Sequence, residues 1–107
     1  MSLLTDNQKK EVQIYDELKK VIDPEVGINI IDLGLVYKIK YSEENGILIE
    51  MTLSTRACPM GNIILENVEK TTQAVFPGVK INTQLVWEPS WSPDFITPAG
   101  KKALNRH

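Results

Sequence analysis

Apolar residues alternate with polar residues in three separate segments of this chain, and this pattern limits how the chain can fold. The segments cover residues 33–41, 47–53 and 79–87, and the odd-numbered positions carry apolar side chains in each of them, with Thr83 as the exception. Such alternation predicts β-strands with one apolar face and one face in water. A sheet of such strands needs a cover on one side only, because its other face is polar.

The first two of these segments are joined through Asn45-Gly46. This dipeptide is favoured in the two-residue turns that connect antiparallel strands. The sequence therefore predicts that these two segments form an antiparallel hairpin, with its turn within Ser42 to Gly46.

Two longer segments have helical spacing. The first, from Asp6 to Ile22, follows Thr5, and Gln8 stands three residues after that threonine, which predicts a capping box. Its apolar stripe contains Val12, Tyr15, Leu18 and Ile22. The second helix is predicted from Pro59 to Phe76, where Pro77-Gly78 ends it.

The last segment, from Glu88 to His107, is rich in proline up to Pro98. It predicts a shaped loop followed by a short helix, with Thr97 as the cap and Pro98 in the first turn. Two tryptophans in and before this loop are explained by burial of their large aromatic surfaces.

The order helix, two strands, helix, strand predicts an α+β fold. We expect a two-layer α/β sandwich with a small mixed sheet and a C-terminal loop and short helix, formed by one domain over residues 1–107 with 1–5 and 105–107 disordered. One face of the sheet is expected to carry Leu35, Tyr37, Ile39, Ile49, Met51, Leu53, Ile81 and Leu85. The helical layer opposite is expected to contain Val12, Leu18, Ile63, Ile64 and Val68.

Charge and cysteine content exclude several classes of function. The net charge is −2 at pH 7 without a basic stripe, so nucleic acid is not an expected partner. One cysteine cannot form an intrachain disulfide, and we find neither a signal peptide nor a membrane-spanning run, so the expected location is the cytoplasm. Zinc-type ligand sets, phosphate-binding glycine loops and a Cys-His catalytic pair are absent from the sequence, which argues against a structural zinc site, a nucleotide and ordinary hydrolase chemistry.

The single cysteine, Cys58, precedes Pro59 at the predicted start of the second helix. Unpaired N–H groups and the positive end of the helix dipole favour a thiolate there, and Arg56 adds a positive charge. We therefore expect the pKa of Cys58 to lie below the ordinary value of about 8.5. The alternative is that Cys58 is a small buried apolar side chain without reactivity.

Polar residues in the predicted loops are candidates for a site around this thiol: Asp23, Glu25, Asp32, Thr52, Thr55 and Asp94. Loops on a small α/β scaffold are where such chemistry collects. Each residue also has a structural alternative: Asp23 can cap a helix or a turn, and Asp32 can stabilise the turn before Gly34. The residues alone leave both roles open.

Four ordered motifs in this sequence resemble those of the SufT/PaaD-type iron–sulfur assembly family, also called domain of unknown function fifty-nine. They are DPE at 23–25, IDLGLVY at 31–37, TLST at 52–55 leading into Cys58-Pro59, and VWEPSWSPD at 86–94. The resemblance covers about Glu17 to Leu104. It is greatest to the stand-alone SufT-like proteins, because the chain carries neither an ATPase domain nor a cysteine-rich tail.

The resemblance implies an Fe–S cluster assembly-like domain with Cys58 as the functional thiol and Asp23, Glu25, Thr55 and Asp32 around it. It implies an accessory factor, not an enzyme, in which Cys58 contacts a transiently bound iron–sulfur cluster, a persulfide or a client thiol. One thiolate cannot hold a cluster alone, so Cys58 would be a metal ligand only with ligands from a partner or second protomer.

The expected partners are Fe–S scaffold or carrier proteins and client apoproteins, with a homodimer as a further arrangement and no nucleotide, nucleic acid or membrane. Two alternatives stay open at this point. One is a thiol-redox protein, which the absence of a resolving cysteine disfavours. The other is a non-catalytic adaptor that binds partners through its aromatic C-terminal segment.

Overall fold

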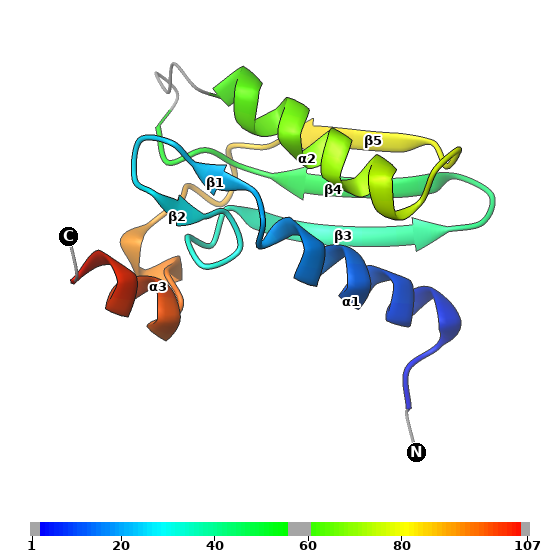
Figure 1. The fold of residues 1–107 in the computed structure, drawn as a ribbon, viewed down its shortest axis with the longest axis horizontal. Helices are drawn as coiled ribbons and strands as arrows, with labels where there is room; N and C mark the ends of the chain where they lie inside the picture. Colours follow the sequence, from blue (N-terminus) through cyan, green and yellow to red (C-terminus); the bar gives the residue numbers. More distant parts are fainter. Residues whose placement is uncertain (1–2, 56–60, 106–107) are drawn as a thin grey trace.

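The computed structural model describes residues 3–55 and 61–105. Its elements in chain order are α1 (Asp6–Leu18), β1 (Ile22–Asp23), β2 (Ile28–Asn29), β3 (Val36–Ser42), β4 (Gly46–Met51), α2 (Gly61–Val75), β5 (Ile81–Leu85), the 3₁₀ helix η1 (Pro93–Phe95) and α3 (Pro98–Leu104). Figure 1 shows this α+β arrangement, which confirms the predicted fold class. No helix in these two ranges is long and apolar enough to cross a membrane.

The main sheet of the described chain has the order β3-β4-β5. β3 and β4 pair antiparallel, whereas β4 and β5 pair parallel, so the sheet is mixed as predicted. Gly46 opens β4 with a φ of 83°, a conformation that glycine adopts easily, and the predicted hairpin is confirmed. β3 and β5 are the two edge strands.

Both long helices cover the same face of this sheet (Figure 1). α1 contacts β3 and α2, and α2 also contacts β5. Beneath them Ile47, Ile49 and Met51 of β4 are buried, while Lys38 and Lys40 on the opposite face are exposed. The prediction of a single helical layer over one apolar face is therefore confirmed for the described residues.

The first helix is shorter than predicted. It begins with the predicted capping box of Thr5 and Gln8 but ends at Leu18, because the chain turns there and Ile22–Asp23 pair antiparallel with Ile28–Asn29. Pro24 forces the residue before it out of the helical region, and the short hairpin uses that extended conformation. The apolar residues keep helical spacing through Ile22 although the helix itself ends at Leu18.

Some side chains that were predicted in the core lie outside it. Val12, Ile63 and Leu85 are 47%, 48% and 37% exposed, and the buried positions of α1 are Ile14 and Leu18. These apolar residues are at the margins of the helical stripe or on an edge strand, where no neighbouring element covers them. The innermost predicted residues, among them Leu35, Ile49 and Met51, are buried as expected.

Tyr37 also departs from the predicted alternation. The pairing of β3 with β4 shifts between Val36 and Lys38, which marks a bulge at Tyr37. Its hydroxyl donates a hydrogen bond to the Pro89 carbonyl at 2.8 Å, and its ring meets Phe95 edge to face at 6.0 Å. The bulge thus turns Tyr37 from the helical layer toward the C-terminal segment.

The C-terminal segment is attached to the rest of the fold by its aromatic residues and by α3. Trp91 Nε1 donates to the Leu33 carbonyl at 2.7 Å, and both tryptophans pack against the core. Thr97 caps α3 with Pro98 in the first turn, as predicted. Gly34 is needed beneath this segment: a Cβ there would lie 2.4 Å from the Phe95 carbonyl oxygen.

One buried hydroxyl gives a stability prediction. Thr83 Oγ1 on β5 is buried without a hydrogen-bond partner among the described residues, whereas the buried Thr72 Oγ1 donates to the Val68 carbonyl at 2.8 Å. We expect Thr83→Val to leave the free energy of unfolding unchanged or raise it by up to about 1 kcal/mol, and Thr72→Val to lower it by about 1 kcal/mol. Urea unfolding measures both, and a larger loss for Thr83→Val than for Thr72→Val would contradict this account.

Candidate functional site

One end of the sheet gathers the segments from which the candidate residues come. Val36 at the start of β3 lies opposite Met51 at the end of β4, and Met51 lies beside Leu85 at the end of β5. Just beyond these strands, the Thr52 N–H donates to the Leu35 carbonyl at 2.8 Å. The loops before β3 and after β4 are therefore joined at this end.

Cys58 and Arg56 lie outside the described residues, so their predicted roles remain predictions. The described residues that border them are Thr55 and Gly61. Gly61 is buried, and a Cβ at this position would lie 2.7 Å from Leu53 Cδ1. The start of α2 thus packs closely on Leu53, two residues after the end of β4.

Asp23 and Glu25 belong to the β1–β2 hairpin. Asp23 is 1% exposed, and its Oδ1 accepts the Glu25 N–H at 2.9 Å. Its backbone carbonyl accepts the N–H groups of Val26 and Gly27, at 3.2 and 2.7 Å. Asp23 therefore stabilises the turn, as its structural alternative requires, and Glu25 lies exposed on that turn.

This hairpin lies near the end of β4 and the start of α2. Figure 1 shows the turn between β1 and β2, the end of β4 and the start of α2 at the same end of the long axis of the domain. The hairpin that carries Asp23 and Glu25 therefore lies at the end of the domain where β4 ends, and Thr55 follows the last residue of β4 by four positions. That they surround the Cys58 sulfur stays a prediction.

Asp32 has both carboxylate oxygens bound within the fold. Oδ2 accepts from Asn29 Nδ2 at 2.8 Å and Oδ1 from Thr97 Oγ1 at 2.9 Å, while the Asp32 N–H donates to Asn29 Oδ1 at 2.8 Å. The Asp32 carbonyl also accepts the Thr97 N–H at 2.8 Å. Asp32 thereby connects β2 to the cap of α3, and sequence analysis missed Asn29, whose only signal is its position three residues before Asp32.

This network should contribute measurably to stability. We expect Asp32→Ala to lower the free energy of unfolding by about 2–4 kcal/mol, because it leaves Asn29 and Thr97 without their charged acceptor. Asn29→Ala should cost less, and the double variant should cost less than the sum of the two. The exposed Glu43→Ala serves as the control and should stay within about 0.5 kcal/mol of the parent protein in urea unfolding. An Asp32→Ala loss as small as that of the control would refute the role.

The remaining candidates are held differently. Thr52 is fully buried, and its hydroxyl donates to the Leu53 carbonyl at 3.5 Å, a long bond. Thr55 and Asp94 are exposed. Within residues 3–55 and 61–105, no three His, Cys, Asp or Glu side chains come together closely enough to hold a metal ion.

Tyr37 is a titratable residue that the sequence analysis placed in the core. Burial raises the pKa of its phenol above 10.0, and the negative charge of Glu88 raises the pKa further. Glu88 directly precedes Pro89, whose carbonyl accepts the Tyr37 hydroxyl, so this carboxylate belongs to the segment that contacts the phenol.

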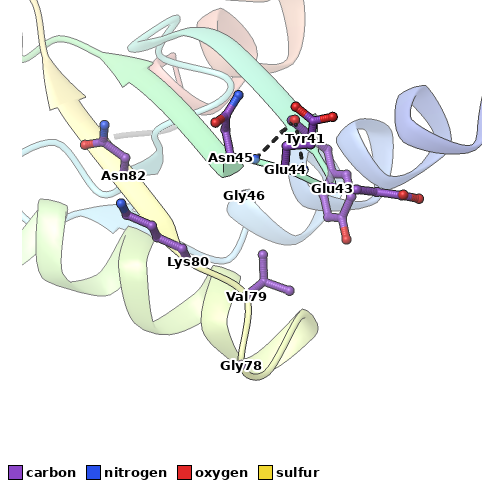
Figure 2. A pocket seen from close by; sticks show the side chains of 10 residues that line it. Tyr41, Glu43, Glu44, Asn45, Gly46, Gly78, Val79, Lys80 and Asn82 are labelled. Atoms are coloured by element: carbon purple, nitrogen blue, oxygen red, sulfur yellow. Dashed lines mark hydrogen bonds between the residues drawn. The ribbon is translucent and has the colours of Figure 1, made fainter.

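A hollow of about 490 Å³ lies at the opposite end of the sheet, between the β3–β4 turn and the start of β5. Figure 2 shows Glu43, Glu44, Asn45 and Lys80 around it, and the Ser42 hydroxyl accepting the N–H groups of Glu44 and Asn45. None of the candidate residues lines this hollow. It is a polar surface feature formed by two turns.

Comparison with known proteins gives consistent matches over most of the chain. The model of a family described as iron–sulfur cluster assembly protein matches residues 11–83. The Fe–S protein maturation auxiliary factor SufT of Staphylococcus aureus is 42% identical over 78% of this chain and 96% of its own length. The Fe–S protein maturation auxiliary factor YitW of Bacillus subtilis is 39% identical over 85% and 89%. A crystal structure of a domain of unknown function, DUF59, from Bacillus anthracis superposes with a TM-score of 0.89 at 36% identity, covering 94% of this chain and 96% of that one.

Proposed function

Because this chain belongs to the iron–sulfur cluster assembly protein family, we propose that it is an accessory factor in the maturation of iron–sulfur proteins. One observation carries the proposal: relatives that match it over nearly their whole length are named maturation auxiliary factors. The factor acts in the cytoplasm and is not itself an enzyme. Its partners are the scaffold or carrier proteins that supply clusters and the apoproteins that receive them.

We propose that Cys58 is the group that contacts the cargo. A thiol must lose its proton to bind iron, so ligation by Cys58 releases a proton. Cys58 is the only cysteine of the chain, and a four-ligand cluster needs further thiolates. A small thiol, a second protomer or a partner protein must supply them, which suits a factor that holds its cargo transiently.

The other candidate residues divide into two proposed roles. Asp23 is buried in a turn and Asp32 is fully hydrogen-bonded, which supports positioning roles for both. Glu25 and Thr55 are exposed. These two residues are the ones we propose to contact the cargo or the client beside Cys58.

The proposed function is tested by the activation of an apoprotein. A purified apo-aconitase is incubated anaerobically with a cluster-loaded scaffold protein, with and without this chain, and aconitase activity is followed over time. We expect the chain to increase the rate of activation without increasing the activity of aconitase that already holds its cluster. An equal rate with and without the chain would contradict the proposal.

A further inference from the structure

An exposed groove follows the free edge of β3. One part, about 370 Å³, lies between α1 and β3 and includes Val12, Tyr15 and Ile39. A second part, about 510 Å³, lies between the start of β3 and the C-terminal segment and includes Tyr37, Pro89 and Phe95. Val36 and Tyr37 line both parts, so they form one continuous surface. We call the two parts together the β3 groove.

The backbone groups of Ile39 in this groove are open to pairing. Tyr41 N–H points away from β4, because it donates to Glu11 Oε2 at 2.8 Å. Alternate residues of an antiparallel strand point the same way, so the Ile39 N–H and carbonyl also point outward. Neither group has a hydrogen-bond partner among the described residues. Such an edge accepts an extended chain as an additional strand.

The groove also exposes apolar surface on both sides of this edge. Val12 and Tyr15 on α1 are 47% and 41% exposed, and Phe95 is 38% exposed. The Tyr37 and Phe95 rings meet at 79°, so that ring faces remain available to a bound group. An extended segment lying along β3 would cover these side chains.

The charge around the groove favours a positively charged occupant. Glu88 directly precedes Pro89, whose carbonyl accepts the Tyr37 hydroxyl at 2.8 Å, and Asp94 adjoins Phe95, whereas residues 81–100 include no lysine or arginine. The side chain of Lys38 lies on the opposite face of the sheet, where it has Glu50 at 4.0 Å, and Lys19 Nζ lies over the Tyr15 ring at 5.5 Å. The favoured position for a further cation is therefore the part of the groove beside Tyr37 and Phe95. A cation over an aromatic ring and beside a carboxylate is stabilised by both groups.

We propose that the β3 groove binds an extended, basic segment of a partner protein, which pairs with Ile39 and places a lysine or arginine beside Tyr37 and Phe95. This proposal goes beyond the maturation role and does not involve Cys58. A second copy of this chain is a poorer occupant. Antiparallel pairing of two copies centred on Ile39 would place Tyr41 of one copy opposite Tyr37 of the other. Glu11, which binds Tyr41, would then lie near Glu88 of the other copy, and like charges would meet.

The test starts from a random nonapeptide library displayed on phage and selected on the full chain. We expect the selected peptides to be enriched in lysine or arginine. Amide resonances of Tyr37, Lys38 and Ile39 should shift when a selected synthetic peptide binds. Replacing its basic residue by citrulline or norleucine, or methylating the backbone nitrogens that pair with β3, should weaken binding by about threefold to tenfold.

Two matched variants locate the charge effect. Glu88→Gln should weaken binding by about threefold to tenfold, while Glu43→Gln at the opposite end of the sheet should leave binding unchanged. The proposal is overturned if no peptide is enriched, if basic residues are not enriched, or if the shifts map elsewhere. It is also overturned if the same amides shift with protein concentration alone, because the edge would then join two copies. Activation of apo-aconitase is measured separately, so failure here leaves the maturation proposal intact.

Discussion

We expect Cys58→Ala to bind at most about one tenth of the iron–sulfur cluster that the parent protein binds after anaerobic reconstitution with iron, sulfide and a small thiol. The chain has no second cysteine, and its one histidine is the terminal His107, so it has no replacement ligand of the type that clusters require. The measurement is visible absorbance together with iron content after removal of unbound metal.

Two controls separate loss of the thiol from loss of the fold. Parent protein alkylated with iodoacetamide should behave as Cys58→Ala does, because the blocked sulfur cannot become a thiolate. Circular dichroism of both should match the untreated protein. Equal cluster content in Cys58→Ala and the parent protein would refute the role of the thiol, and slow alkylation at neutral pH would favour the inert, buried alternative.

Gly34→Ala is expected to lower the free energy of unfolding by about 3 kcal/mol or more. Gly34 has a φ of 76°, and an added Cβ would lie 2.4 Å from the Phe95 carbonyl oxygen and 2.8 Å from its carbonyl carbon. Backbone atoms cannot rotate away as the end of a side chain can. The C-terminal segment would therefore have to move off the sheet, or the turn before β3 would have to change.

Gly27→Ala is the matched control for this effect. Gly27 has a φ of 80°, but an added Cβ would have no atom within 4 Å, so only the backbone strain of about 1 kcal/mol remains. Gly46→Ala and Gly78→Ala repeat the comparison. A Cβ at Gly46 would lie 2.3 Å from the Lys80 carbonyl oxygen, whereas a Cβ at Gly78 would have no atom within 4 Å. Equal losses for Gly34→Ala and Gly27→Ala in urea unfolding would show that close packing contributes nothing.

Gly34 and its neighbours in the chain contact the C-terminal segment. Gly34 supports Phe95, Leu33 accepts a hydrogen bond from Trp91, and Asp32 binds the cap of α3. The IDLGLVY segment at 31–37 is therefore the support for the C-terminal segment. A variant that loosens it should weaken peptide binding in the β3 groove as well as stability.

Local pattern was sufficient for much of the fold. The alternation around Ile39 and Ile49, the turn at Gly46 and the caps at Thr5 and Thr97 are each decided by neighbours within a few residues. Of the candidate site, the residue set around Cys58 stays a prediction, and the structure places the hairpin that carries Asp23 and Glu25 at the end of the domain where β4 ends. The sequence did not predict the tasks of these residues, because Asp23 and Asp32 look alike as loop aspartates until their partners are known.

What the sequence determined by itself was therefore the kind of fold, since amphipathic strands and helices can bury their apolar sides in few ways. Only the tertiary structure decided where α1 ends, where Tyr37 points and what Asp32 binds. β1 exists because Ile22 and Asp23 pair with Ile28 and Asn29, and Tyr37 leaves the alternation because the pairing of β3 with β4 shifts. Thr97, the cap of α3 that binds Asp32, lies 65 residues further along the chain. Such choices depend on contacts between distant residues, which local spacing does not encode.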